Sequence, residues 1–297
     1  MRATALEFPC IDTGGPQPVW TGEAFQIGAT ERRILAYGSQ PSGWTDDLTS
    51  LHEATAGEDH FIDLASRAYA VSEAIRTCGH RGAAVLEIGV SSGFLMRDLV
   101  TALPDAVLIG SDYTLGTLEA AAARLPASIP LLQFDLVQCP LPDASVDGVI
   151  LLNVLEHIED DRAAVAQLHR ILRPGGVAIL EVPAGAGLYD NYDRALMHWR
   201  RYQMSGFAAL VRGAGFAIER RSHLGFLLYP GFFAAKKIGQ RRPAPPQALN
   251  ASVETSIGWT RRLRALAGPL MRFEAGLRRV AYLPFGIRCL ITARKAA

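Results

Sequence analysis

Three acidic residues stand at the ends of short apolar runs, where their carboxylates could bind a ligand. Glu87 lies near the end of the run at 83–90, Asp112 closes a second run and Asp135 a third. A carboxylate pairs with cationic groups and accepts hydrogen bonds from hydroxyl and amino groups. The small residues at 89–93 let the backbone approach a ligand closely and direct N–H groups at it. Because Glu87 would repel a pyrophosphate, and this turn lacks the dinucleotide fingerprint and the P-loop pattern, the residues favour a cationic ligand.

Histidine and aromatic side chains follow the later apolar runs. His157 comes after the fourth run and could act as a general base. A structural histidine that caps the next helix is the other interpretation. The segment at 184–203 contains Tyr192, His198 and Arg201, which could form a roof over a substrate. An ordered surface loop packed on the first long helix is the alternative for this segment.

The sequence spacing indicates no metal site. The four cysteines are far apart and form no C-x-x-C pair, so we expect neither a zinc site nor a disulfide framework. Glu156 and Asp160–Asp161 are interpreted as solvated charges at the start of a helix. We therefore expect no bound metal, and the cysteine pattern favours a reducing, cytoplasmic setting.

The apolar runs that carry these residues alternate with helical patterns. Such alternation predicts a doubly wound, mostly parallel α/β sheet that is covered by helices on both faces. In this class of fold, ligands bind at the carboxyl ends of the strands, near the point where the strand order reverses. We expect a first helix from near His60, strands at 83–90, 106–112, 129–135, 146–153, 176–183, 216–226 and 287–295, and helices at 93–103, 114–125, 162–172 and 205–216.

In this order, the motifs resemble those of the class I S-adenosylmethionine-dependent methyltransferase family, of the small-molecule, methyltransferase-11 or UbiE-like type. The EIGVSSG stretch at 87–93 is similar to the family pattern E/D-x-G-x-G-x-G, with Ser91 in place of the middle glycine. LEHIED, LHRILRPGGVAILEVP and D-x-x-x-x-H-x-R-R-Y follow at the expected places. The resemblance covers about 60–220 and 287–295. It implies a Rossmann-like sheet of seven strands and S-adenosylmethionine as the cofactor.

The resemblance also implies a role for each candidate residue. Asp112 would accept hydrogen bonds from both ribose hydroxyls, and Asp135 from the adenine amino group, with the next backbone N–H on the ring. From the residues alone, an ordinary glycine turn and a helix N-cap at Asp112 are the alternatives. The predicted cofactor-binding residues are Glu87, Gly89, Ser91, Gly93, Asp112, Tyr113, Asp135, Leu136, Asn153 and Val154; the predicted catalytic residue is His157; the predicted substrate-binding residues are Tyr192, His198 and Arg201.

The chain divides by composition and charge. Residues 1–59 are rich in turn formers and are predicted as an irregular N-terminal extension. The methyltransferase domain is expected over 60–297, with a basic helical insert at about 227–284. Residues 1–219 hold 15 basic and 27 acidic residues, a net charge of −12, whereas 220–297 hold 15 basic and 2 acidic residues, a net charge of +13. The basic part is expected to meet an anionic partner: a membrane surface, nucleic acid, an acidic substrate or the acidic body of the protein itself.

The pattern after the fourth run bears on the acceptor. Asn153-Val154-Leu155-Glu156 replaces the [ND]-P-P-[YF] motif that suits planar amino nitrogens, so modification of nucleic-acid bases is disfavoured. The sequence predicts methyl transfer to O, N or C of a small-molecule or lipid-like acceptor, with a peripheral membrane contact through the amphipathic insert as one interpretation. A nucleic-acid methyltransferase and a non-catalytic scaffold that binds S-adenosylmethionine are the alternatives. No apolar run reaches the roughly 18–20 residues of a membrane span.

Overall fold

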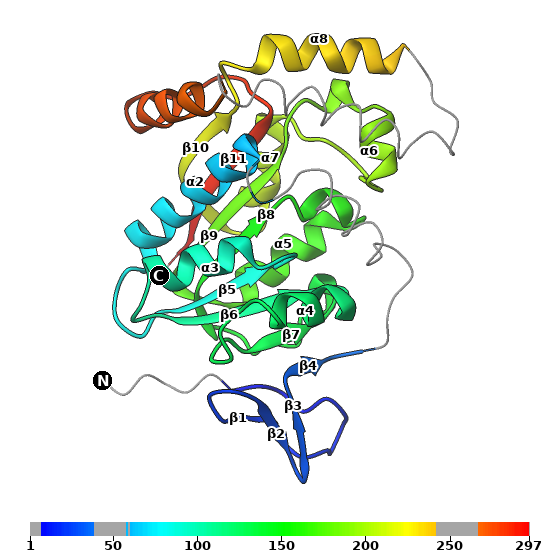
Figure 1. Cartoon of the computed structure of the whole chain (residues 1–297), viewed down its shortest axis with the longest axis vertical. Helices are drawn as coiled ribbons and strands as arrows, with labels where there is room; N and C mark the ends of the chain where they lie inside the picture. The colour runs from blue at the N-terminus through cyan, green and yellow to red at the C-terminus, as the bar shows by residue number, and fades with distance from the viewer. Residues whose placement is uncertain (1–6, 39–57, 59, 242–266, 297) are drawn as a thin grey trace.

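The computed structural model describes residues 7–38, 58, 60–241 and 267–296, and a twisted sheet of eight strands forms its centre (Figure 1). The strand order is β10-β11-β9-β8-β5-β6-β7-β4. Only β11 runs antiparallel to its neighbours β9 and β10. The strands are β4 (Ile34–Ala36), β5 (Ala84–Ile88), β6 (Val107–Asp112), β7 (Leu131–Gln133), β8 (Val146–Leu152), β9 (Leu172–Pro183), β10 (Phe216–Leu224) and β11 (Arg288–Lys295).

The order of the strands reverses at β5. From β5 the chain proceeds outward through β6 and β7, then returns to β8 on the other side of β5 and continues to β9. This is the arrangement of a doubly wound fold, and it creates a switch point at the carboxyl ends of β5 and β8. The predicted fold class is therefore confirmed, with β4 as a strand in addition to the expected seven.

Helices cover both faces of the sheet because successive side chains of each strand point to opposite sides. In β5, Val85 packs with the helices of one face and Leu86 with those of the other. The first face carries α2 (Phe61–Cys78), α3 (Phe94–Ala102) and α4 (Leu115–Ala122), and the second carries α5 (Asp161–Ile171) and α7 (Met204–Gly213). The predicted helices are thus confirmed to within a few residues.

The N-terminal extension is more ordered than its composition indicated. Strands β1 (Val19–Trp20), β2 (Phe25–Ile27) and β3 (Thr30–Arg32) form a small antiparallel sheet. Phe25 is buried in the core cluster of the second face, with its ring against those of Phe8 and Trp20. Strand β4 then joins the main sheet parallel to β7. The expectation of an irregular extension was therefore wrong for these residues, because tertiary packing stabilises strands too short to stand out as a pattern. Residues 39–57 lie outside the described part, and the domain boundary near 59 stays a prediction.

The basic insert contributes α8 (Tyr229–Gln240) and a helix over 267–280. Ala267 and Met271 of the second helix are buried against the α2 side of the sheet. The amphipathic pattern of 257–283 predicts one apolar face that carries Trp259, Leu263, Leu266, Leu270 and Phe273. Phe273 is instead 67% exposed, because the buried face carries Glu274, which accepts hydrogen bonds from the backbone N–H groups that precede α8. Trp259, Leu263 and Leu266 lie outside the described residues. Within the described residues, every helix is too short or too polar to cross a membrane.

Candidate active site

The turn after β5 is built for close approach to a ligand. Gly89 has φ +83°, and a Cβ atom there would lie 2.5 Å from Val154 Cγ2. Gly93, at the start of α3, has φ +78°, and Ser91 also has a positive φ of 49°. Only glycine adopts such angles readily, so the left-handed backbone of Ser91, at the middle position of the motif, is modestly unfavourable for a residue with a side chain. The predicted turn residues therefore form one tight loop whose floor is the side chain of Val154.

The ends of β5, β6 and β7 bring the predicted acidic residues to one edge of the sheet. Ile88 pairs with Ser111, and Asp112 pairs with Gln133, so the strands finish side by side. Asp112 is buried and accepts hydrogen bonds from the backbone N–H of Ser91, at 3.1 Å, and of Thr114, at 3.2 Å. The turn after β5 is thus held to the end of β6 by the hydrogen bond from Ser91 to Asp112.

Asp135 lies one strand further along the same edge. Its carboxylate accepts a hydrogen bond from the backbone N–H of Val137 at 2.9 Å and so starts the short helix η1 (Leu136–Gln138). Leu136 is buried, and Tyr113 is half-buried beside the end of β6. The three positions that the resemblance assigns to cofactor binding therefore follow consecutive strands of one edge.

The environment of Glu87 favours a cationic ligand. Its side chain is buried, and its Oε2 atom has no hydrogen-bond partner among the described residues. Burial raises the pKa of the Glu87 carboxyl well above its usual value, and the negative charge of Asp112 raises it further. A cation placed beside this carboxylate would restore the charged form.

The segment after β8 turns back toward the site. Asn153 has a positive φ of 54° and donates a hydrogen bond from Nδ2 to Glu181 Oε1 at 2.9 Å. Val154 then contacts Gly89, as described above. This segment therefore lies against the turn after β5, although its predicted contact with a cofactor stays a prediction.

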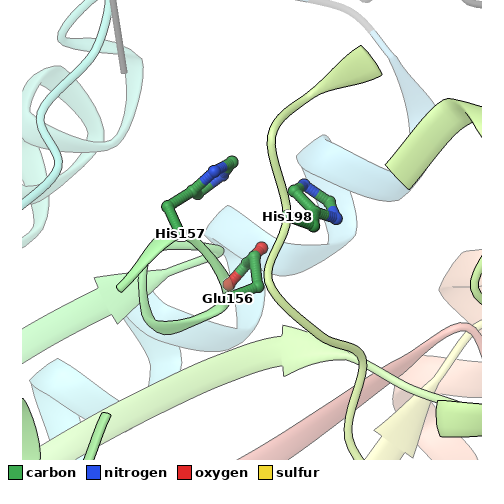
Figure 2. A group of neighbouring side chains, drawn as sticks. All are labelled: Glu156, His157 and His198. Atoms are coloured by element: carbon green, nitrogen blue, oxygen red, sulfur yellow. The ribbon is translucent and has the colours of Figure 1, made fainter. Parts of the chain in front are cut away.

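Figure 2 shows Glu156, His157 and His198 gathered at the end of β8. His157 ends the short helix η2 (Leu155–His157), and its ring lies 4.6 Å, centroid to centroid, from that of His198 in an edge-to-face arrangement. Glu156 was expected to be solvated but is fully buried, because the backbone of Trp199 donates a hydrogen bond to the Glu156 carbonyl and the 184–203 segment covers it. The structure thus joins the predicted catalytic histidine to one predicted substrate-binding residue.

A buried network of charges supports the predicted roof segment. Asp193, in α6 (Asn191–Ala195), lies 3.0 Å from His198 Nδ1, 2.8 Å from Arg201 Nη1 and 3.0 Å from Lys236 Nζ. Arg201 also donates from Nε to the Ala184 carbonyl at 2.9 Å. These contacts occupy much of its guanidinium, so the geometry favours a positioning role for Arg201 over direct substrate contact.

The centre of this network was not among the predicted site residues. Asp193 is the first residue of the D-x-x-x-x-H-x-R-R-Y pattern, and that position in the motif was the available signal. Lys236 lies in α8, within the basic insert, and no local pattern distinguishes it from its exposed neighbours. Tyr192 contributes its ring, whose centroid lies 4.9 Å from Lys236 Nζ.

Comparison with known proteins agrees with the geometry. Residues 86–180 match the family model described as a methyltransferase domain. Over 140 residues, 46% of the chain, the sequence is 35% identical to a probable S-adenosylmethionine-dependent methyltransferase of Mycolicibacterium smegmatis and covers 53% of that protein. It is 30% identical over 134 residues, 42% of the chain, to the ubiquinone/menaquinone biosynthesis C-methyltransferase UbiE of Syntrophotalea carbinolica and covers 56% of it.

A solved structure shows the same fold. The phosphoethanolamine N-methyltransferase 2 of Haemonchus contortus, in complex with S-adenosylmethionine, superposes with a TM-score of 0.57 at 16% identity, over 85% of this chain and 58% of that one. The chain spans about half the length of the sequence relatives named above. Residues 86–180 are therefore similar to the methyltransferase domains of S-adenosylmethionine-dependent enzymes, and the strand order of the sheet agrees with that similarity.

Proposed function

We propose that the protein is a methyltransferase that uses S-adenosylmethionine to methylate a small-molecule acceptor. One observation carries the proposal: Glu87, Asp112 and Asp135 lie at or just after the ends of adjacent strands, beside a turn that a Cβ atom at Gly89 would block. These three carboxylates are acceptors that suit a ligand with a cationic group, a diol and an aromatic amine. S-adenosylmethionine carries all three groups, and when bound it supplies an activated methyl group.

The chain's own residues then divide the remaining work. Glu87 would hold the cationic group, Asp112 would accept from the ribose hydroxyls, and Asp135 would accept from the adenine amino group. His157 would accept the proton that an acceptor group loses, because a neutral imidazole is a competent base near neutral pH. Tyr192, His198 and the Asp193 network would hold the roof that excludes water from this region.

The acceptor is further proposed to be lipid-like. A cavity of about 480 Å³ lies between α8 and the loop that precedes β11. Its lining includes Tyr229, Phe233 and Phe285, with Lys237 and His223 as polar groups. Phe233 and Phe285 are 41% and 43% exposed, so the apolar surface is open on one side. The name of the related UbiE enzyme, which acts in ubiquinone and menaquinone biosynthesis, supports an apolar acceptor.

A peripheral membrane contact is the weaker part of this proposal. Several basic residues of 220–297 pair with acidic residues of the main body instead of remaining free for an anionic surface. Arg220 bonds to Glu73, Arg288 to Asp63 and Glu181, Arg294 to Glu219, and Lys236 to Asp190 and Asp193. The same pairing argues against a nucleic-acid surface at these residues. The proposed membrane contact is therefore limited to Tyr229, Phe233 and Phe285 at the opening of the cavity, together with Lys237.

Two measurements test the proposed function. Titration calorimetry with S-adenosylhomocysteine should give one site per chain. Incubation of metabolite and lipid extracts with the protein and methyl-labelled cofactor should give a product that carries the label by mass spectrometry. Binding without any labelled product would favour the scaffold alternative, and the absence of binding would contradict the cofactor assignment itself.

A further inference from the structure

We propose that Glu156, His157 and His198 bind one divalent transition-metal cation, and that this cation holds an oxygen atom of the acceptor. The first part concerns the protein alone. The second part rests on the proposed methyltransferase function.

The three side chains offer one ligand atom each, and these atoms all lie within 4.8 Å of one another. Ligands on opposite sides of a cation at 2.0–2.2 Å are about 4.0–4.4 Å apart, so small side-chain adjustments would complete the shell. Figure 2 shows that the groups come from two segments, with Glu156 and His157 after β8 and His198 from the loop that passes beside them. Because about forty residues separate the two segments, the sequence pattern indicated no metal site.

The Glu156 carboxyl is an unsatisfied buried group. Its exposed fraction is 0%, and neither of its oxygens has a hydrogen-bond partner among the described residues. A buried carboxylate without partners is costly, and such groups in proteins are normally paired or bound to a metal.

The nearby cations of the chain are already engaged. Arg288 donates to Glu181 Oε1 at 2.7 Å and to Asp63 Oδ1 at 2.6 Å. Arg201 donates to Asp193 and to the Ala184 carbonyl. Both arginines influence Glu156 only through space, so an added cation would supply the direct partner that these side chains do not.

The surroundings of His198 match those of a metal-ligating histidine. Its Nδ1 lies 3.0 Å from Asp193 Oδ1, and the carboxylate fixes the proton on Nδ1, which leaves the lone pair of Nε2 for a ligand. Asp193 is itself fixed by Arg201 and Lys236. Asp193 therefore orients His198 beside the buried Glu156 carboxylate, as a carboxylate commonly orients a metal-ligating histidine.

Two imidazole nitrogens and one carboxylate oxygen select the class of metal. This donor set suits zinc, iron, cobalt or manganese rather than magnesium or calcium, which take oxygen ligands. Three protein ligands leave coordination positions open, as in catalytic metal sites. A cation there would hold an acceptor hydroxyl and lower its pKa, which favours an oxygen acceptor over carbon or nitrogen. With a cation bound, His157 would serve as a ligand in place of the base proposed above, and the proton of the acceptor hydroxyl would pass to solvent.

The test begins with the chelator-treated full chain and Co²⁺ as the probe. Titration should produce visible absorption bands that saturate at one cobalt per chain, and calorimetry with Zn²⁺ should give the same stoichiometry. Glu156→Gln and His198→Gln should each weaken binding at least 100-fold, and Asp193→Asn about 10–100-fold. His223→Gln is the matched control, since His223 is also buried but binds the Leu283 carbonyl, and it should bind cobalt as the wild type does.

The outcomes separate the two parts of the proposal and the proposed function. Each variant is first titrated with S-adenosylhomocysteine, and unchanged affinity shows that it is folded. No cobalt bands in the wild type, or unchanged bands in Glu156→Gln, would overturn the metal site. Loss of labelled product on chelation, restored by Zn²⁺, is the expected result for the second part. Full activity of the chelated protein would overturn the second part alone, and cobalt binding without any methyl transfer would contradict the proposed function instead.

Discussion

The proposed cofactor edge and the proposed acceptor side of this protein are built in different ways. The cofactor edge consists of the turn after β5 and the ends of β6 and β7, and its geometry comes from the backbone: positive φ angles, strand register and N–H groups. The acceptor side joins the segment after β8, the roof at 184–203 and α8 through buried ion pairs. Local sequence determines the geometry of the cofactor edge, whereas the acceptor side forms only when segments distant in the chain pack together. Substitutions in the cofactor edge should therefore change cofactor affinity, and substitutions in the acceptor side should change stability or acceptor binding.

The largest expected effect is on the acceptor side. Lys236→Met leaves the buried Asp190 without its ion-pair partner and Asp193 with Arg201 and His198 alone, and should lower the free energy of unfolding by about 3–5 kcal/mol. Lys237→Met, next to it in α8, is the control, because Lys237 contacts Gly187, Gln240 and the ring of Phe233 rather than a buried carboxylate. Urea denaturation measures both. Equal stabilities for the two variants would show that the network does not hold the roof.

The second effect is on the cofactor edge. Asp112→Ala removes a charged acceptor and should weaken S-adenosylhomocysteine binding by about 1.5–3 kcal/mol. Asp143→Ala is the control, because Asp143 is 78% exposed and pairs with Arg170 away from this edge. Calorimetry on both variants decides the matter, and an affinity for Asp112→Ala equal to that of the control would remove Asp112 from the cofactor site.

A smaller effect separates backbone strain from site geometry. Gly89→Ala meets both a positive φ and a contact at 2.5 Å, whereas Gly175→Ala meets a positive φ of 79° with open space around it. Both should lose about 1–2 kcal/mol of stability from the backbone alone. Only Gly89→Ala should also lose cofactor affinity, as measured by S-adenosylhomocysteine titration. Matching losses of affinity would mean that the turn acts through overall stability.

The smallest effect is a dependence on pH. A cationic ligand binds the ionised form of Glu87, whose pKa is raised by burial, so binding below that pKa must release a proton. Affinity for S-adenosylhomocysteine should therefore rise with pH, by at most about 1.4 kcal/mol per pH unit, and level off above the pKa. Glu87→Gln should bind more weakly and show no such rise. A parallel slope in the variant would assign the proton to another group.

The same contrast explains what could be predicted from the sequence. Apolar strands, helical periodicity and the glycine turn are local patterns, so the positions of Glu87, Asp112 and Asp135 at one edge were predictable. The burial of Glu156 was not, because a charged residue at a helix start is usually solvated, and the residues that cover it lie about forty positions later. Lys236 and β4 were missed for the same reason: each depends on a partner far away in the chain.

The position of β11 has a consequence for how the protein folds. Strand β11 inserts between β9 and β10, and in the described sheet β10 has no other neighbour. About sixty residues separate the end of β10 from the start of β11. During synthesis, β10 is therefore made well before its only hydrogen-bonding partner, and its edge stays unpaired until the last strand emerges. The nascent chain can form the turn after β5 early, whereas the hydrogen bonds from Arg288 to Glu181 and Asp63 form only after β11 has been made. A chain that is truncated before β11 would therefore keep this turn but expose the unpaired edge of β10, and we expect it to aggregate.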